Sequence, residues 1–212
     1  MSFDRLAPHY RWMERLLAGE KLQRCRTTFL NTIPRPKRVL MPGEGDGRCL
    51  VELLRAHPDA HFTCVDASQR MIERARARVL EHGLREEHID FIHADATRWQ
   101  APPGKFDLLV THFFLDCFRA DQLAKLVPRL AAAAGPDARW LLADFREPAA
   151  GVAKWRAHGI LQAMYFFFQR AARLPASRLT VPDAFLQRSG FILRERRLSE
   201  WGLLHSDLWQ RG

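Results

Sequence analysis

Short apolar runs alternate with amphipathic segments along this chain, and the alternation predicts strands separated by helices. The apolar runs are continuous, as expected for strands buried on both faces, whereas the other segments repeat apolar residues every three or four positions. The predicted strands are 38–41, 61–66, 89–94, 106–111 and 138–145. The predicted helices between them are 48–56, 68–81 and 121–134. Strands that alternate with helices in this way predict a doubly wound α/β sheet.

The segments before the first strand predict an addition to this sheet. Amphipathic patterns at 3–17 and 20–30 predict an N-terminal helical cap. Two prolines within 31–37 mark a linker into the sheet. We therefore expect a single domain over the whole chain, with the cap and linker at 1–36 and the α/β core at 37–212.

The segments after the fifth strand predict a long helix and a closing hairpin. An apolar run that contains Tyr165 predicts an aromatic helix within 150–174. This helix is expected either to cover the acceptor of a reaction or to pack on the core or in a homodimer interface. The last elements are expected to be a helix at 182–190 and antiparallel strands at 191–198 and 203–209.

The composition is that of a globular protein of one domain. The chain has 212 residues, of which 47% are hydrophobic and 27% are charged. No apolar run is long enough to cross a bilayer, and the N-terminus lacks the core of a signal peptide. The cysteines are scattered without a Cys-x-x-Cys pair, which disfavours a zinc site and a disulfide framework. We therefore expect a cytoplasmic protein with no membrane span and no metal.

The formal net charge of +9 raises the question of a nucleic-acid partner. Arginine is common and lysine is rare, and the chain has neither lysine runs nor Arg-Gly repeats. The basic residues of 70–78 fit the solvated face of one helix. These features disfavour a nucleic-acid partner.

A glycine-rich loop, Gly43-Glu44-Gly45-Asp46-Gly47, follows the first predicted strand and precedes a helix. Glycine lets the backbone turn sharply and approach a ligand, and the amides of the next helix are expected to face a polar group of that ligand. Asp66 ends the second strand about 20 residues later, where a carboxylate can accept from ribose hydroxyls. A dinucleotide site requires glycine three residues after Gly45, and that position is Arg48. The spacing therefore disfavours a pyrophosphate ligand.

This loop resembles motif I of the class I S-adenosylmethionine-dependent methyltransferases, although Met41 stands where the family usually has an acidic residue. The stretch from Phe3 to Tyr10 resembles the start of the quinone-biosynthesis methyltransferases, where it caps the cofactor pocket. The resemblance implies a Rossmann-like seven-stranded sheet with strand order 3-2-1-4-5-7-6 and an antiparallel last strand. It also implies S-adenosylmethionine as the cofactor.

The resemblance assigns roles to particular residues. It places Gly43, Gly45 and Gly47 along the methionine part of the cofactor, Asp66 on the ribose and Asp95 on the adenine amino group. Glu44 and Asp46 are the two candidates for the missing charge near the cofactor's ammonium group. The expected cofactor-binding residues are Tyr10, Gly43, Glu44, Gly45, Asp66, Ala67, Asp95, Ala96 and His112.

Candidate catalytic residues follow the fourth strand and lie in the aromatic helix. His112 and Asp116 are the polar members of an apolar segment at the sheet's carboxyl edge, where each is a candidate general base, cofactor contact or structural hydrogen-bonding group. Tyr165 is the third candidate, on the covering helix. The Asn/Asp-Pro-Pro-aromatic motif of base methyltransferases does not occur here, which weakens methylation of a nucleobase.

The sequence therefore favours methyl transfer to a small, partly apolar acceptor such as a phenol or quinol precursor. Three alternatives remain open at this stage. One is an RNA methyltransferase, and another is a non-catalytic protein that binds S-adenosylmethionine. The third, an NAD(P)-dependent oxidoreductase, is disfavoured by Arg48 and by the lack of a Tyr-x-x-x-Lys pair.

Overall fold

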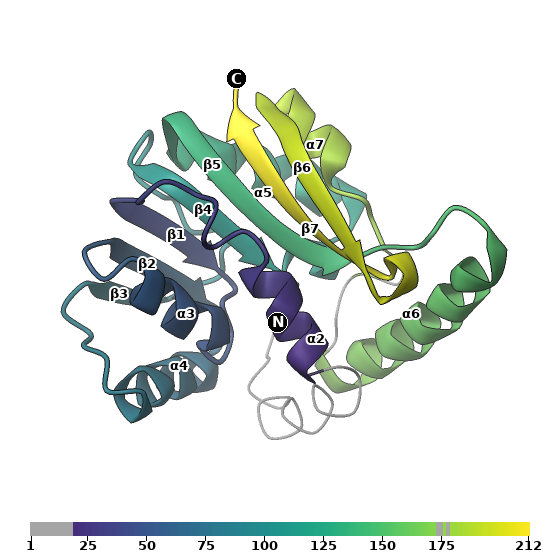
Figure 1. Cartoon of the computed structure of the whole chain (residues 1–212), viewed down its shortest axis with the longest axis horizontal. Coiled ribbons are helices and arrows are strands. Elements are labelled where there is room, and N and C mark those ends of the chain that lie inside the picture. Colours follow the sequence, from purple (N-terminus) through teal and green to yellow (C-terminus); the bar gives the residue numbers. More distant parts are fainter. Residues whose placement is uncertain (1–18, 173–175, 177–178) are drawn as a thin grey trace.

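The computed structural model describes residues 19–172, 176 and 179–212, which form a twisted sheet with helices on both faces (Figure 1). The strands are β1 (Arg38–Pro42), β2 (His61–Asp66), β3 (Ile89–His93), β4 (Phe106–His112), β5 (Ala134–Phe145), β6 (Phe191–Ser199) and β7 (Leu204–Arg211). The α-helices are α2 (Gly19–Thr27), α3 (Arg48–Ala56), α4 (Gln69–Glu81), α5 (Ala120–Ala133), α6 (Gly151–Ala172) and α7 (Asp183–Arg188). Short 3-10 turns are η2 (Leu115–Cys117) and η3 (Glu200–Gly202).

The seven strands have the order β3-β2-β1-β4-β5-β7-β6, as the sequence predicts. Strands β1 to β5 pair in parallel, and β7 pairs antiparallel with both β5 and β6. Strands β2 and β3 lie on one side of β1 and strand β4 lies on its other side, so the strand order reverses between β1 and β4. In open α/β sheets this switch point opens a crevice at the carboxyl ends of the strands, where ligands bind.

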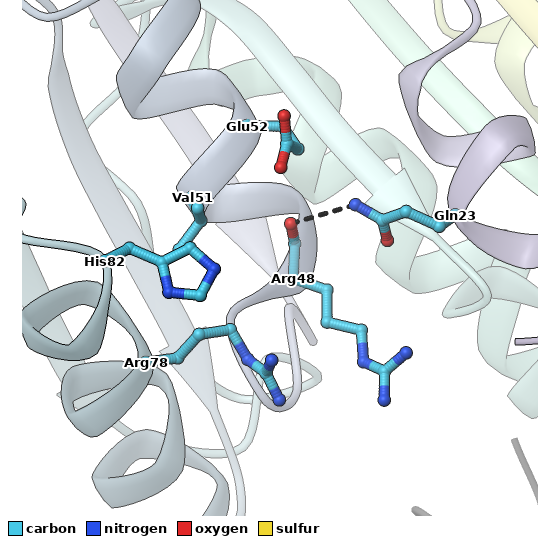
Figure 2. A pocket seen from close by; sticks show the side chains of 6 residues that line it. All are labelled: Gln23, Arg48, Val51, Glu52, Arg78 and His82. Atoms are coloured by element: carbon cyan, nitrogen blue, oxygen red, sulfur yellow. Dashed lines mark hydrogen bonds between the residues drawn. The ribbon is translucent and has the colours of Figure 1, made fainter. Parts of the chain in front are cut away.

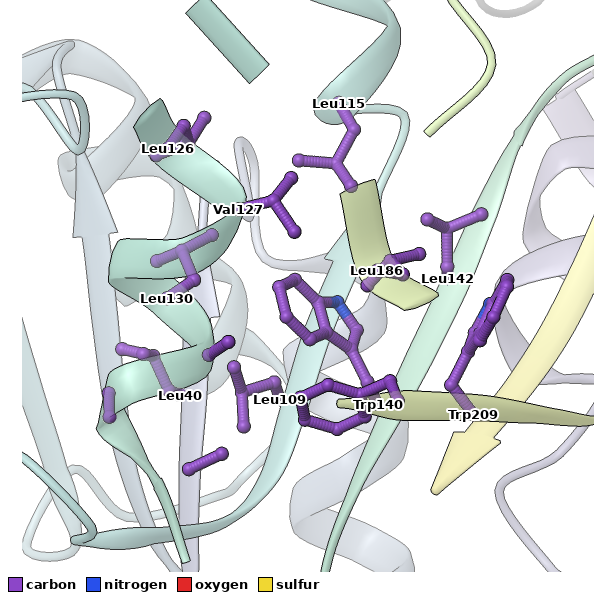
Figure 3. Packing of buried hydrophobic residues seen from close by; sticks show 14 of the residues in the cluster. Leu40, Leu109, Leu115, Leu126, Val127, Leu130, Trp140, Leu142, Leu186 and Trp209 are labelled. Carbon is purple, nitrogen blue, oxygen red and sulfur yellow. The ribbon is translucent and has the colours of Figure 1, made fainter. Parts of the chain in front are cut away.

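The core is built by side chains that alternate between the two faces of the buried strands. Val39 and Met41 of β1 pack toward α3, while Leu40 packs toward α5 with Trp140 and Trp209 (Figure 3). This period of two is that of a strand, and burial on both faces explains why the strands are continuously apolar. The packing fixes the strand ends and therefore the positions of the residues that follow them.

The junction of α5 and β5 differs from the expected loop. The sequence predicted that Gly135-Pro136 closes the helix and that the strand starts at residue 138. In the structure β5 starts at Ala134, directly after α5. The pairing of β4 with β5 shifts between the pairs Phe106–Ala134 and Leu108–Arg139, so the glycine and proline lie in an irregular part of the strand.

A smaller difference concerns α2. The pattern at 20–30 predicted a helix to residue 30, but α2 ends at Thr27 and turns continue the chain. The aromatic helix predicted within 150–174 is confirmed as α6, which spans Gly151–Ala172. No helix in the described part of the chain has both the length and the apolar character needed to cross a membrane.

Candidate active site

The loop between β1 and α3 holds three glycines with left-handed backbone conformations. The φ angle is 69° at Gly43, 73° at Gly45 and 83° at Gly47. A Cβ added to Gly43 would lie 2.1 Å from Cδ2 of Phe114, and one added to Gly47 would lie 2.8 Å from the Cα of Ala75. A Cβ added to Gly45 meets no atom of the described chain within 4 Å. Gly45 therefore leaves open space beside its backbone, as a ligand cradle requires.

Glu44 caps α3 from within the loop. Its Oε1 accepts hydrogen bonds from the amides of Cys49 at 2.9 Å and Leu50 at 2.8 Å. The sequence led us to expect the first amides of this helix to face the ligand, and these two instead bind Glu44. Burial raises the pKa of Glu44 to about 7, although the two amides and the charge of Arg26 oppose the rise. Met41, at the position that is usually acidic in the family, is fully buried in the core.

Asp66 ties the glycine loop to the end of β2. Its Oδ2 accepts a hydrogen bond from the amide of Gly45 at 3.2 Å, and its Oδ1 accepts one from the amide of Ser68 at 2.8 Å. Two predicted cofactor residues that lie 21 positions apart thus meet. Ala67 lies between Asp66 and Ser68 in the turn after β2, with its carbonyl oxygen 3.2 Å from Nε2 of His93. A carboxylate oxygen has more than one lone pair, so Asp66 retains capacity to accept from ribose hydroxyls.

Asp95 and Ala96 follow β3 at the same edge of the sheet. Oδ1 of Asp95 accepts hydrogen bonds from the amide of Thr97 at 2.9 Å and from its hydroxyl at 2.6 Å. Partial burial raises the pKa of Asp95, but the hydrogen bonds from Thr97 contribute to a net lowering. The carboxylate is therefore ionised and exposed, while Ala96 is buried in the core beneath it.

His112 ends β4 with an unsatisfied nitrogen. Its Nδ1 is buried and has no hydrogen-bond partner within residues 19–172, 176 and 179–212. Burial lowers the pKa of His112 to about 3, and the positive charge of Arg26 contributes to the lowering. The imidazole is therefore neutral at physiological pH. A buried polar atom without a partner is uncommon in folded proteins, so Nδ1 is a candidate to bind a polar group of a ligand.

Arg26 is a candidate site residue that sequence reasoning missed. It comes from α2, is only 7% exposed, and lies with its guanidinium 5.1 Å from the ring centroid of Phe113. Its charge lowers the pKa of both Glu44 and His112, which means that it lies near both. The signal was present in the sequence, since Arg26 follows the buried face of α2 at helical spacing, with Leu22 four residues before it.

Asp116 lies in η2 and is coupled to a second carboxyl group, that of Asp144 at the end of β5. The amide of Asp116 donates to Oδ2 of Asp144 at 3.1 Å, and both side chains are buried. Burial raises the pKa of Asp116 to about 6 and that of Asp144 well above its ordinary value, where the charge of Asp116 adds to the rise. Sequence reasoning missed Asp144 as a site residue, although a carboxylate near the end of a buried strand is the pattern that revealed Asp66.

Tyr165 reaches this carboxyl pair from α6. Its hydroxyl donates to the backbone oxygen of Asp116 at 3.2 Å, so the fold joins two predicted catalytic residues that are 49 positions apart. Burial, with the charges of Asp116 and Asp144, raises the pKa of Tyr165 above its usual range. The phenol therefore stays protonated. Tyr10 falls outside the described residues, and its predicted contact with the cofactor stays a prediction.

A separate hollow of about 180 Å³ lies between α2, α3 and α4 (Figure 2). The residues that line it are Gln23, Arg48, Val51, Glu52, Arg78 and His82. Nε2 of Gln23 donates to the backbone oxygen of Arg48 at 3.1 Å, and both arginines form ion pairs with Asp46. None of the predicted site residues lines this hollow.

Comparisons with known proteins agree with this geometry. Residues 39–137 match the protein family described as "Methyltransferase domain". A search of curated proteins finds no match. Mitomycin 7-O-methyltransferase has a similar structure, with a TM-score of 0.69 at 18% identity, covering 100% of this chain and 61% of that one.

Two other solved structures are also similar. The S-adenosylmethionine-dependent methyltransferase SibL has a TM-score of 0.69 at 24% identity, covering 96% of this chain and 57% of that one. Magnesium protoporphyrin IX methyltransferase from Synechocystis, solved with S-adenosylhomocysteine bound, has a TM-score of 0.64 at 15% identity, covering 91% of this chain and 82% of that one. The chain spans only about three fifths of the length of the mitomycin enzyme and of SibL. Residues 39–137 therefore match a methyltransferase domain, and the sheet has the strand order of the S-adenosylmethionine-dependent methyltransferase fold.

Proposed function

We propose that this protein transfers the methyl group of S-adenosylmethionine to a hydroxyl group of a small, partly apolar acceptor. The observation that carries the proposal is the contact between Gly45 and Asp66 at the switch point of the sheet, with open space beside Gly45. When bound, S-adenosylmethionine supplies a methyl group that is already activated by a sulfonium. The protein then has to bind the acceptor, align it with the methyl group, exclude water and accept the proton of the acceptor.

The residues at the carboxyl edge fit this cofactor. Asp66 would accept from the ribose hydroxyls, and Asp95 would accept from the adenine amino group. The backbone at Gly45 would lie along the methionine part. Arg26 would supply positive charge for the methionine carboxylate, a role that the sequence did not suggest. Glu44, with a pKa of about 7, would accept from the ammonium group in its ionised form.

His112 would orient the acceptor rather than remove its proton. A general base works best when its pKa lies near the operating pH, and a pKa of about 3 is far below it. A neutral imidazole can still bind a hydroxyl group through Nδ1, which has no partner within the described chain.

The carboxyl pair of Asp116 and Asp144 is better suited to accept the proton. The pKa of Asp116 is about 6, close to the value that a base needs near neutral pH. With the cofactor bound, the pair would take up the proton that the acceptor hydroxyl releases on methylation. Tyr165 would act as a positioning residue, because its hydroxyl donates to the backbone oxygen of Asp116.

A small, partly apolar acceptor is favoured by the walls of this region. Phe113, Phe114 and Phe145 lie about the ends of β4 and β5 and are only partly buried. Two of the similar structures support the same class of acceptor, since they are named for methylating mitomycin and for pyocyanin biosynthesis. Cytoplasmic location and a homodimer remain predictions from the sequence.

The proposal is tested with the purified full chain, S-adenosylmethionine and a panel of small phenols, with methylated products detected by mass spectrometry. We expect methylated phenols, and calorimetry should show binding of S-adenosylhomocysteine but not of NADH. Methylation of bulk RNA without methylation of any phenol would refute the acceptor class. Tight binding of S-adenosylhomocysteine without turnover of any acceptor would instead support a non-catalytic binding protein.

A further inference from the structure

The outer face of the first turns of α6 carries large apolar side chains. Val152 and Trp155 lie three residues apart and are 76% and 77% exposed. Trp201, in the turn between β6 and β7, is 72% exposed. Single exposed apolar residues are ordinary on protein surfaces, but a cluster of large ones marks an interaction site.

The turn that carries Trp201 is held in an unusual backbone conformation. The φ angles of Glu200, Trp201 and Gly202 are 51°, 62° and 81°. The left-handed region is strained for a residue with a bulky side chain. Arg156 of α6 holds this turn, since its Nη1 donates to the backbone oxygen of Glu200 at 3.3 Å and its guanidinium lies 5.6 Å from the ring centroid of Trp201. The fold thus fixes an exposed indole ring beside Arg156 of α6. The turn between β6 and β7 that carries this ring lies near α6 (Figure 1).

The charges around these side chains are positive. Helix α6 contains Lys154 and Arg156 but no aspartate or glutamate along its whole length. Of the carboxylates in the flanking segments, that of Glu147 lies 3.5 Å from Nδ1 of His158, and that of Glu200 forms an ion pair with Lys21. Apolar rings bordered by cations are the pattern of a surface that meets anionic lipid.

We propose that Val152, Trp155 and Trp201, bordered by Lys154 and Arg156, form a lipid-docking patch that binds an anionic membrane surface. Indole rings suit the level of the lipid headgroups, and lysine and arginine are attracted to anionic headgroups. Val152 and Trp155 are three residues apart and so lie along one side of α6. The helix would therefore lie parallel to the bilayer surface and would not enter the bilayer.

The chemistry of the patch disfavours two other occupants. A second copy of this chain would bring Lys154 and Arg156 against the same cations of an identical acid-free helix, and like charges at close range repel. A nucleic acid would match the cations and the indoles, but the aliphatic Val152 offers no ring for a base to stack on.

Binding is measured by sedimentation of the full chain with two kinds of vesicle, phosphatidylcholine alone and phosphatidylcholine with about one third phosphatidylglycerol. We expect binding only to the anionic vesicles, and weaker binding when the salt is raised from about 0.1 M to 1 M. Trp155→Ser and Trp201→Ser should each reduce the affinity about tenfold, because each removes a large apolar side chain from the contact.

Leu80→Ser is the matched control, since Leu80 is 61% exposed on the distant helix α4 and its loss should leave vesicle binding unchanged. Equal binding by Trp155→Ser, Trp201→Ser and the wild type would overturn the proposal. A dimer that Trp155→Ser converts to a monomer, seen by light scattering without vesicles, would overturn it in favour of a second copy. Loss of RNA binding in the tryptophan variants, with no vesicle binding by the wild type, would overturn it in favour of a nucleic acid. These measurements use no methyl donor, so their outcome is separate from that of the proposed function.

Discussion

The amide of Gly45 donates a hydrogen bond to Oδ2 of Asp66 at 3.2 Å, joining the loop after β1 to the end of β2. This contact holds the open side of the glycine loop against the carboxylate that is proposed to bind ribose. The backbone position of Gly45 therefore depends on the carboxylate of Asp66. A substitution of either residue should change the affinity for the same ligand.

Asp66→Asn should reduce the affinity for S-adenosylhomocysteine at least about tenfold, since hydrogen bonds to a charged group contribute about 1.5–3 kcal/mol each. The amide side chain keeps one oxygen acceptor, so the fold should survive. Calorimetry measures the affinity. Asp90→Asn is the matched control, because Asp90 is exposed on β3 and its carboxylate forms a hydrogen bond with His61. Unchanged affinity in Asp66→Asn would contradict the proposed site.

Gly45→Ala should separate the cost of backbone strain from loss of the ligand cradle. Gly45 and Gly83 both have positive φ and open space around an added Cβ, so alanine at either should cost about 1 kcal/mol of stability. Only Gly45→Ala should also weaken the binding of S-adenosylhomocysteine. Gly43→Ala should be far more destabilising because its Cβ would overlap the ring of Phe114. Urea unfolding and calorimetry together check these three variants, and equal affinities for Gly45→Ala and Gly83→Ala would contradict the expected role of the loop.

His112→Gln should make the protein less sensitive to acid. The folded state lowers the pKa of His112 from 6.5 to about 3, so the unfolded chain binds an extra proton between these values. Stability contributed by the neutral imidazole is therefore present above pH 6.5 and lost as the pH falls toward 3. Urea unfolding at about pH 7.5 and pH 5 measures the difference, with His88→Gln as an exposed control. If His112→Gln and the wild type lose the same free energy of unfolding between the two pH values, His112 is not the buried neutral group described.

Asp116→Asn should have the opposite effect on the pH dependence of stability. The folded state raises the pKa of Asp116 from 3.8 to about 6 and so retains a proton that the unfolded chain releases. Its contribution to stability is present below pH 3.8 and is lost as the pH rises through about 6. The variant cannot ionise and should therefore lose less stability between about pH 4.5 and pH 7.5.

The same variant tests the proposed chemistry. If the carboxyl pair accepts the proton, the wild-type kcat should rise as the pH passes about 6, and this inflection should disappear in Asp116→Asn. Asp121→Asn serves as the control, because Asp121 is exposed and binds Arg119 at 3.0 Å. A wild-type inflection retained in Asp116→Asn would assign the proton to another group.

Arg26→Met should weaken the binding of S-adenosylhomocysteine about tenfold by removing the charge proposed to meet its carboxylate. Methionine keeps much of the side chain's apolar length, so packing against Phe113 should be partly retained. Arg24→Met is the matched control on the same helix, since the Arg24 side chain is 80% exposed. Equal affinities in the two variants would remove Arg26 from the site.

Much of the fold was predictable because the determining signals are local. The apolar strands, the helical spacing between them and the glycine loop each depend on residues close together in the chain. Asp66 was predictable for the same reason, since a strand that begins at His61 must place it at the carboxyl edge. Sheet order followed from resemblance to a family, and the pairing of the strands confirms it.

The tertiary structure alone decided which charged groups share an environment. Arg26 is buried near His112 because α2 packs against the sheet, and Asp116 is coupled to Asp144 because β4 and β5 end side by side. Glu44 accepts hydrogen bonds from two amides of α3, the helix that follows its loop, and no sequence motif predicted this contact. The physical reason is that secondary structure follows from local spacing, whereas a pKa and an unsatisfied hydrogen bond depend on burial and on distances between segments far apart in the chain.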